Sequence, residues 1–299
     1  MAGISLILQN NPTVTVINCG KSSPKLGGTI DISAFPNLQE FRCDNNDITA
    51  INGYEDNSNF RVIQFFNNKV TGSIPSLSAK TELTLFSCHI NELTGQLPSL
   101  SGLSNLEFFS FHTNKFTGPI PSLTGLSNLK EFRCQINQLT GTIPSLSGLS
   151  NLENFQCHSQ TGATKLTGPI PSLSELNNLS VFNCASNQLT GTIPSLSGLS
   201  NLEFFSCWSN QLTNFAGGSV SNTLGDFQAQ NNQLRATSVN SILAAFVAAG
   251  RTTGTPILNG TCILNLGGTT NSRPTGQGVT DVTTLRNRGW SVTTGTALL

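Results

Sequence analysis

The sequence predicts a curved parallel β-solenoid of about ten rungs, followed by a small C-terminal α+β module. Three observations predict this fold class. A unit of mostly 22 or 23 residues recurs from Leu26 to Leu234, each unit contains a short stretch in which large apolar and polar residues alternate, and an asparagine follows that stretch at a fixed distance. Units too small to bury an apolar face alone bury it by stacking on their neighbours.

The second half of the unit, Leu-Thr-Gly-x-Ile-Pro-Ser-Leu, marks the repeat. It begins at Leu93, Phe116, Leu139, Leu166 and Leu189, and weaker copies begin at Leu26, Ile48, Val70, Leu212 and Leu234. Successive copies start 22, 22, 23, 23, 23, 27, 23, 23 and 22 residues apart. The long interval contains the insertion Thr161-Gly-Ala-Thr, which we expect to form an exposed loop because repeat proteins tolerate insertions there.

The first half of the unit predicts one strand for each rung. A Phe and a Cys two residues later alternate with polar residues, which is the period of a strand with one buried face. Leucines three residues apart, such as Leu146, Leu149 and Leu152, predict a short, irregular return limb with 3₁₀ turns. The Phe/Cys pairs are Phe41/Cys43, Phe86/Cys88, Phe132/Cys134, Phe155/Cys157, Phe182/Cys184 and Phe205/Cys207.

An asparagine three residues after the Cys position recurs in eight rungs. An amide side chain both donates and accepts hydrogen bonds, so this column can satisfy backbone groups that the coil buries. We therefore expect a structural ladder without a catalytic role. Its members are Asn46, Asn68, Asn91, Asn114, Asn137, Asn187, Asn210 and Asn232, and Gln160 takes the position in the longer rung.

The combined unit, LxxLxxFxCxxNxL followed by TGxIPSLSG, resembles a leucine-rich repeat, and its LTGxIPxL half is similar to the plant-type subclass, shortened by one residue. The resemblance covers residues 26–234. It implies a leucine-rich repeat solenoid over residues 26–235. Residues 1–25 are then an N-terminal cap, and residues 236–299 are a C-terminal capping helix with a small α/β module.

Both ends need a cover because a stack of rungs exposes apolar faces there. Alternating Ile4, Leu6 and Leu8 predict a capping hairpin or irregular coil. At the other end the pattern predicts a helix over 237–249 stopped by Gly250, a strand over 257–266, a helix over 281–288 and a strand over 290–294. The tail strings NLGGTTNSRPTGQG and TLRNRGWSV are similar to modules of repeat-bearing bacteriophage structural proteins, which implies a virion component.

Composition argues against several functions. Fifteen basic residues balance fifteen acidic ones and no basic run occurs, so we expect no nucleic-acid partner. The longest apolar run, 242–249, is far shorter than the roughly 20 residues of a membrane-spanning helix, and the N-terminus lacks a secretory-signal pattern. GxSxG, GxxxxGK and HExxH motifs are absent, so we predict neither enzymatic activity nor a cofactor.

The eight cysteines predict buried thiols. Six of them share an inward column with Phe65, Phe111 and Ala229, and a column that accepts such residues selects apolar groups. Adjacent rungs bring column members about 5 Å apart, which leaves a disulfide such as Cys134 with Cys157 as the alternative. The sequence has no CxxC, so the usual zinc spacing is missing.

Residues that alternate with the buried Phe and Cys define one exposed face, the concave face of a curved solenoid, where such proteins bind. Apolar patches on this face are informative because nothing in the repeat requires them. A metal at His89 and His112 lacks a third ligand, so no metal is predicted. The candidate binding residues are Phe66, Leu85, His89, Phe108, His112, Arg133, His158, Val181, Phe204 and Trp208.

These observations predict a non-enzymatic binding or structural protein. We expect a virion or surface-appendage component, such as a tail, fibre or decoration, whose concave face contacts a protein or a host-surface glycan. A protein partner is favoured over a glycan, and packing against a neighbouring subunit is an equally open interpretation. The alternative is a cytoplasmic leucine-rich repeat adaptor that binds one protein.

Overall fold

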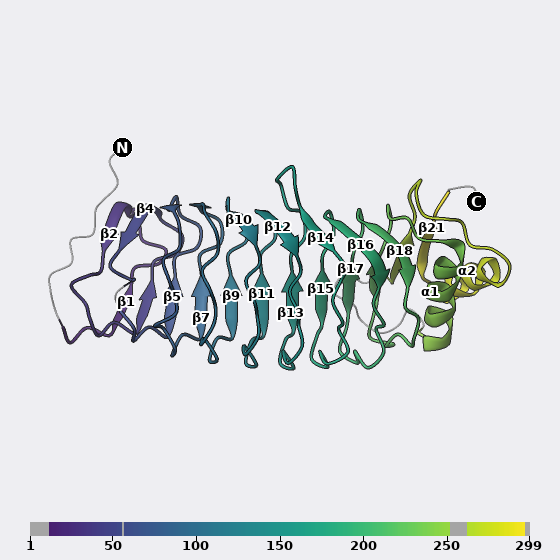
Figure 1. The fold of residues 1–299 in the computed structure, drawn as a ribbon, viewed down its shortest axis with the longest axis horizontal. Coiled ribbons are helices and arrows are strands. Elements are labelled where there is room, and N and C mark those ends of the chain that lie inside the picture. The colour runs from purple at the N-terminus through teal and green to yellow at the C-terminus, as the bar shows by residue number, and fades with distance from the viewer. Residues whose placement is uncertain (1–11, 56, 252–261, 297–299) are drawn as a thin grey trace. The chain divides into compact units, whose positions relative to one another are not determined.

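The computed structural model describes residues 12–55, 57–251 and 262–296. Within these residues the chain forms two compact units. Unit 1 runs to residue 140 and includes 161–164, and unit 2 contains 141–160 and the residues from 165 onward. Each unit is a parallel β-solenoid in which one turn of the coil supplies one strand to a long sheet, as Figure 1 shows.

The long sheet of unit 1 follows chain order, with every neighbouring pair parallel. Equivalent residues of consecutive rungs lie side by side, for example Phe86 beside Phe109. Such in-register stacking turns each repeat position into a column. The strands are β1 (Val16–Asn18), β3 (Glu40–Arg42), β5 (Val62–Gln64), β7 (Leu85–Ser87), β9 (Phe108–Ser110) and β11 (Glu131–Arg133).

Unit 2 repeats this arrangement and extends it beyond the last repeat. Two strands of the C-terminal module continue the sheet, because Asp226 pairs with Ile263 and Ile263 with Ser291. The tail therefore adds rungs to the sheet as well as covering its end. The strands are β13 (Asn154–Gln156), β15 (Val181–Asn183), β17 (Phe204–Ser206), β19 (Asp226–Gln228), β20 (Ile263–Leu266) and β21 (Ser291–Thr294).

The Thr-Gly half of the unit forms short strands of its own, which the sequence pattern did not predict. These strands also pair in parallel from one turn to the next. The rest of the limb is as expected, since Leu149 N–H donates to Leu146 O at 3.2 Å and Leu152 N–H to Leu149 O at 2.9 Å. The strands are β2 (Gly27–Asp31), β4 (Asp47–Asn52), β6 (Thr71–Gly72), β8 (Glu92–Leu93), β10 (Thr117–Pro119), β12 (Gln138–Thr142), β14 (Leu166–Gly168), β16 (Gln188–Ile193) and β18 (Gln211–Phe215).

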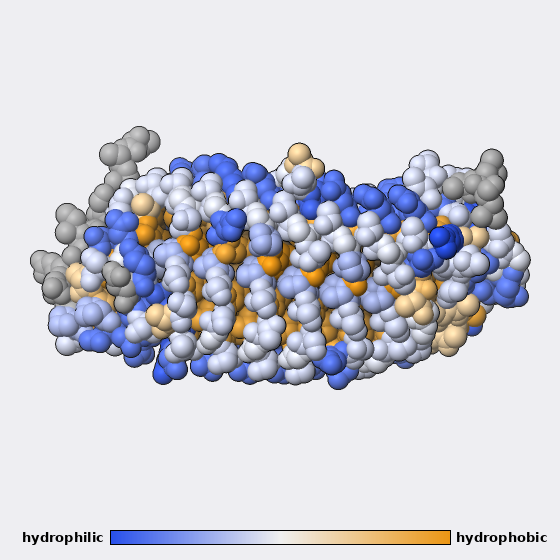
Figure 2. All heavy atoms as spheres, in the orientation of Figure 1, coloured by the Kyte–Doolittle hydropathy of each residue, from blue (hydrophilic) through white to orange (hydrophobic). Residues whose placement is uncertain are grey.

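The core is a column of phenyl rings beside a column of thiols. Phe182 and Phe205 are fully buried and stack with centroids 5.4 Å apart and a 14° interplanar angle. Each such side chain contributes roughly 1.5–3 kcal/mol through burial alone. Figure 2 shows apolar residues in the furrows between more polar ridges on the side in view.

Lys80 is the exception in the core. It occupies a repeat position that holds Leu103 in the next rung, and its side chain is fully buried. Its Nζ donates to the carbonyl oxygens of Glu55 at 3.0 Å and Asn57 at 2.8 Å. The hydrocarbon stem fills the leucine position while the ammonium satisfies buried carbonyls, which allows a charged residue there.

One residue in each rung, two positions after the Cys column, has a left-handed backbone. The φ angles run from 52° to 58° for Asn45, Asn67, Ile90, Thr113, Ile136, Ser159, Ser186, Ser209 and Asn231. Asn tolerates this region, whereas a β-branched side chain clashes with its own backbone there. Ile90 and Ile136 therefore occupy strained positions.

The helix that directly follows the repeats lies against the last of them, as the sequence predicted. Helix α1 (Ala236–Ala249) ends at Gly250, whose φ of 72° gives a left-handed cap. Phe246 on this helix packs edge-on against Phe227 with centroids 5.5 Å apart. Helix α2 (Gln277–Asn287) follows β20. Neither of these described helices has the length and apolar character needed to cross a membrane.

The N-terminal segment contributes a strand where a hairpin or coil was predicted. Residues 16–18 form β1, which pairs in parallel with β3 and so starts the long sheet. Ile4, Leu6 and Leu8, on which the hairpin prediction was based, lie outside the described residues. In the longer rung, the inserted residues 161, 163 and 164 are exposed, in agreement with the expected loop.

Candidate binding face

The long sheet of each unit has a buried side and an open side. On β17 and the two residues after it, Phe205 and Cys207 are fully buried, whereas Phe204 and Trp208 are half-buried on the opposite side. We call the side that carries Phe204 and its equivalents the open face. All ten residues proposed from the sequence as binding residues lie on strands or strand ends of this face.

Three aromatic rings of unit 1 form a stack on the open face. The rings of Phe66 and His89 have centroids 4.4 Å apart and an 8° interplanar angle. The rings of His89 and His112 also lie 4.4 Å apart, at 22°. The stack arises because parallel pairing places the same position of consecutive rungs one strand spacing apart.

Hydrogen bonds hold the two imidazoles by their Nδ1 atoms. The Ser87 hydroxyl lies 2.9 Å from Nδ1 of His89, and the Thr113 hydroxyl lies 3.0 Å from Nδ1 of His112. Burial lowers the pKa of His89 to about 4, with Arg133 adding to the lowering and Asp44 opposing it. The His89 ring is therefore neutral at pH 7 and acts as a flat, uncharged surface.

A second apolar pair lies beside the stack. Leu85 and Phe108 are register partners on β7 and β9, and Phe108 is 37% exposed. The Lys130 ammonium lies 5.9 Å from the centre of the Phe108 ring and pairs with the Glu107 carboxylate at 2.6 Å. An exposed phenyl ring beside an ion pair offers a partner both apolar area and charge.

Ion pairs and amides lie at both margins of the unit 1 face. Arg42 pairs with Glu40 at 3.3 Å and donates to Gln64 Oε1 at 2.9 Å. Arg133 pairs with Glu131 at 2.9 Å. The Arg133 Nε and the Gln135 Oε1 are buried and have no hydrogen-bond partner among residues 12–55, 57–251 and 262–296.

The unit 2 face contains the second group of predicted residues. Val181 and Phe204 are register partners on β15 and β17, and Trp208 follows Phe204 on the same face. His158 lies on this face as well, and its Nδ1 is 3.1 Å from the Ser159 hydroxyl. Burial lowers the pKa of His158 too, so it adds no positive charge at neutral pH.

The asparagine column forms a hydrogen-bonded ladder. Asn187 is representative: its Nδ2 donates to Cys157 O and Cys184 O at 3.1 and 3.0 Å, and its Oδ1 accepts from Leu166 N–H at 3.3 Å. The side chain therefore links consecutive turns. Gln160 is buried and donates to Cys157 O at 3.0 Å, which is the bond that a ladder asparagine makes within its own turn.

Sequence reasoning missed two members of these columns. Asn271 joins the ladder, because its Nδ2 donates to Ala229 O at 2.9 Å and its Oδ1 accepts from Leu234 N–H at 3.0 Å. The intervening helix breaks the repeat spacing, so only the fold could place it. Cys19 extends the thiol column, with its Sγ 3.0 Å from Cys43 Sγ. Its separation of 24 residues from Cys43, close to one repeat, was the available signal.

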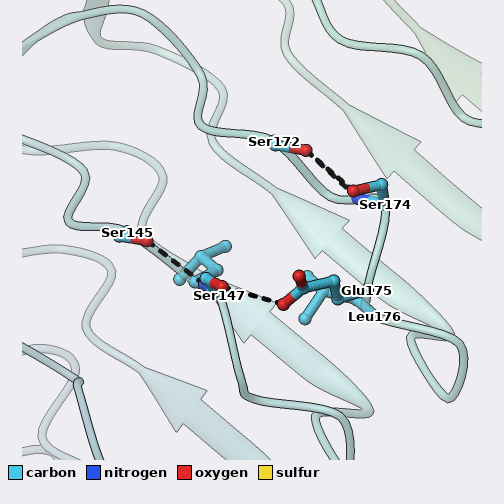
Figure 3. A pocket seen from close by; sticks show the side chains of 7 residues that line it. Ser145, Ser147, Ser172, Ser174, Glu175 and Leu176 are labelled. Atoms are coloured by element: carbon cyan, nitrogen blue, oxygen red, sulfur yellow. Dashed lines mark hydrogen bonds between the residues drawn. The ribbon is translucent and has the colours of Figure 1, made fainter.

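A small depression on the return limbs of unit 2 contains serines and one carboxylate (Figure 3). Glu175 accepts from the Ser147 hydroxyl at 2.8 Å and from Gly148 N–H at 2.9 Å. These bonds, the backbone one first, lower the pKa of Glu175. No histidine is among the residues that line the depression. We interpret Glu175 as a brace between adjacent turns.

The described residues contain no group of three or more His, Cys, Asp and Glu side chains placed to hold a metal ion. His89 and His112 stack face to face, so their in-plane lone pairs run side by side and do not converge on one point. This geometry suits a ring stack better than a shared metal ligand set.

The solved structures similar to this chain share its coil of parallel strands. The plant peptide hormone receptor RGFR1 in complex with RGF2 is 26% identical, with a TM-score of 0.71 over 96% of this chain and 44% of that one. The leucine-rich repeat ectodomain of the Arabidopsis thaliana receptor kinase GASSHO1/SCHENGEN3, in complex with CASPARIAN STRIP INTEGRITY FACTOR 2, is 24% identical, with a TM-score of 0.66 over 94% and 39%. The fold is a leucine-rich repeat solenoid.

Another similar solved structure is that of a plant ice-binding protein. It is 20% identical, with a TM-score of 0.51 over 73% of this chain and 75% of that one. Folds shared by receptors and an ice-binding protein do not determine function, which must be argued from the site. The chain spans less than half the length of the two receptors. No protein-family model matches the sequence, and a search of curated proteins found no similar sequence.

Proposed function

We propose that this leucine-rich repeat chain is a non-enzymatic binding protein whose open face in unit 1 contacts a protein partner. The observation that carries the proposal is the stack of Phe66, His89 and His112 next to the pair Leu85 and Phe108. Ion pairs lie at the margins of this apolar area. An aromatic centre with a charged rim is the composition of many protein interfaces.

The similarity to the receptor RGFR1 supports a protein partner. That receptor is solved in complex with RGF2. The similarity covers 96% of this chain and 44% of the receptor. The unit 1 face fits such a role because its rings are fixed by stacking and hydrogen bonds before any partner arrives. Pre-organised groups lose less conformational entropy on binding, so they contribute more affinity.

Substitution on the open face tests the proposal. The tagged full chain and its Leu85→Ser/Phe108→Ser variant are incubated with extract from the source, and bound proteins are identified by mass spectrometry. Val279→Ser is the matched control, because Val279 is a 54% exposed apolar residue on α2. We expect a protein that wild type and the control retain and the double variant loses. If no protein shows this pattern, the unit 1 face is not a protein-binding site.

On location, we propose a virion or surface appendage, with other subunits of the particle as partners. The support is the resemblance of NLGGTTNSRPTGQG and TLRNRGWSV in the tail to bacteriophage structural modules. Mass spectrometry of purified particles tests it, and we expect the chain in a fixed ratio to the other subunits. Absence from particles, with recovery of a single cytoplasmic partner, supports the adaptor alternative instead.

A further inference from the structure

The open faces of the two units differ in charge. The unit 1 strands carry Glu40, Arg42, Glu131 and Arg133 on this face. On the described strands of unit 2, the same positions contain one ionisable side chain, Asp226. The others are amides, hydroxyls and apolar groups: Asn154, Gln156, Val181, Asn183, Phe204, Ser206, Gln228, Ile263, Asn265, Ser291 and Thr293. The strand positions of the unit 2 face therefore carry little charge, which suits an uncharged ligand.

The centre of this face is strand β17 with its two neighbours. Phe204 and Trp208 flank Ser206 on one side of the strand, and the register places Asn183 and Gln228 on either side of Ser206. Gln230 continues the column beside Trp208, since Ser209 N–H donates to Gln230 O at 2.9 Å. We call this group the tryptophan patch: Asn183, Phe204, Ser206, Trp208, Gln228 and Gln230.

The Trp208 indole packs against no other aromatic ring of the described residues, and its N–H makes no hydrogen bond with them. The second tryptophan is the opposite case. Trp290 packs edge-on against Phe246 at 5.2 Å, and its Nε1 donates to Arg251 O at 3.2 Å. Trp208 is half-buried on the open face, so its ring surface and its N–H are offered outward.

Two further polar atoms of the patch lack partners. Ser206 Oγ and Gln230 Oε1 are buried and form no hydrogen bond with the described part of the chain, and the Ser206 side chain is fully buried. Buried polar groups in folded proteins are usually paired because an unpaired one is costly, so each of these atoms indicates a missing partner. Ser206 lies two residues before Trp208 on the same side of the strand, and Gln230 lies beside Trp208 on the next turn, so both atoms adjoin the indole ring.

The charged residue of the face orients an amide. Gln228 Nε2 donates to both carboxylate oxygens of Asp226, at 3.0 and 3.2 Å. This contact fixes the plane of the Gln228 amide and leaves its Oε1 to accept from a ligand hydroxyl. Burial raises the pKa of Asp226, and the hydrogen bond from Gln228 opposes this shift.

We infer that the tryptophan patch binds a neutral carbohydrate, a hexose unit of a glycan chain. A sugar ring offers an apolar C–H face for Trp208 and hydroxyls that both donate and accept, as the amides and Ser206 require. The patch covers three neighbouring strands. Because adjacent strands lie roughly 4.8 Å apart, the patch is about 10 Å wide, which is the size of one or two sugar units.

Titration of the full chain with neutral hexaoses tests the inference. Cellohexaose, maltohexaose, mannohexaose and chitohexaose are added at up to millimolar concentration while tryptophan fluorescence is recorded. Because Trp290 is only 3% exposed, a change in emission reports on Trp208. We expect saturable binding of at least one hexaose, confirmed by calorimetry. Trp208→Ala should weaken its affinity about tenfold or more, and Gln230→Leu should weaken it as well.

Matched variants separate this inference from the proposed protein contact. Leu85→Ser/Phe108→Ser changes the unit 1 face and should leave sugar affinity unchanged, while Trp208→Ala should leave protein capture unchanged. Circular dichroism checks that each variant is folded. Absence of binding for all four hexaoses overturns the inference, as does equal affinity of wild type and Trp208→Ala. If Trp208→Ala instead abolishes protein capture, the patch belongs to a protein interface and the inference is wrong.

Discussion

The rings of His89 and His112 stack with their centroids 4.4 Å apart on adjacent strands of unit 1. Two imidazolium ions at this distance would repel each other, so the stack requires that at least one ring is neutral. Desolvation of His89 meets this requirement, because burial lowers its pKa to about 4. The open face of unit 1 thus keeps a flat, uncharged centre at neutral pH.

The first prediction concerns pH. In the unfolded chain His89 has an ordinary pKa of about 6.5, whereas in the folded chain the pKa is about 4. Between these values the unfolded state binds more protons, so His89 lowers stability progressively as the pH falls from about 6.5 towards 4. Urea unfolding of wild type and His89→Phe across this range should show the variant gaining relative stability in acid. A difference between the two that is independent of pH contradicts the prediction.

The second prediction concerns the asparagine ladder. Asn187→Ala removes the acceptor for Leu166 N–H and the donor to Cys157 O and Cys184 O, all of them buried. We expect a loss of roughly 2–4 kcal/mol in the free energy of unfolding. Asn201→Ala is the control, since its bond to Asn177 O is exposed and its loss should cost less than about 0.5 kcal/mol. Equal losses in both variants would rule out a special role for the ladder.

The third prediction concerns backbone strain. Ile136 has a φ of 56° and is 40% exposed, so Asn at this position should relieve the steric clash and leave the core intact. Ile136→Asn should stabilise unit 1 by about 1 kcal/mol. Val279→Asn on α2 replaces an exposed β-branched residue without the left-handed backbone, and should give no gain. Thermal unfolding measures the stability of both variants. A lower stability of Ile136→Asn than of wild type would contradict the prediction.

The fourth prediction concerns the thiols. Cys19 is half-buried, and the pKa of its thiol is lowered because the thiolate accepts a hydrogen bond from Cys43. Burial raises the pKa of Cys88, Cys157 and Cys207. Cys19 should therefore be the first thiol of the folded chain to react with a thiol reagent.

Oxidised glutathione should convert Cys19 and Cys43 to a disulfide. The Cys19 thiolate attacks one sulfur of glutathione disulfide and releases reduced glutathione, and the Cys43 thiol then displaces the second glutathione as its own proton is lost. Peptide mapping should find this pair first, and Cys43→Ser should stop the reaction at the mixed disulfide. A first cross-link within the buried column, such as Cys184 with Cys207, would be the contrary outcome.

Much of the fold was predictable because its signals are local. The alternation of Phe205 and Cys207 with polar neighbours predicted a strand with one buried face, and both side chains are fully buried. The helix predicted over 237–249 forms over 236–249 and ends at Gly250, whose missing side chain permits the left-handed cap. The limits proposed for the terminal modules, 1–25 and 236–299, remain predictions.

Other features depend on neighbours that no single rung specifies. Lys80 is fully buried because carbonyl oxygens of the preceding turn accept its ammonium protons. Asn271 enters the ladder after a helix that interrupts the spacing. The strands of the Thr-Gly half were not predicted, because parallel pairing between turns organises segments that lack a strong strand pattern of their own.

The sequence by itself determined that the repeats stack as a coil, which repeat positions face its core and where most of the amide column lies. Periods of two residues and of 22 or 23 residues can be read along the chain, because each reflects a backbone geometry that every unit repeats. The tertiary structure alone decided that two histidines stack, that two cysteine sulfurs touch and that Ser206 Oγ and Gln230 Oε1 find no hydrogen-bond partner among the described residues. These are relations between side chains on different strands, and they are set by register and burial.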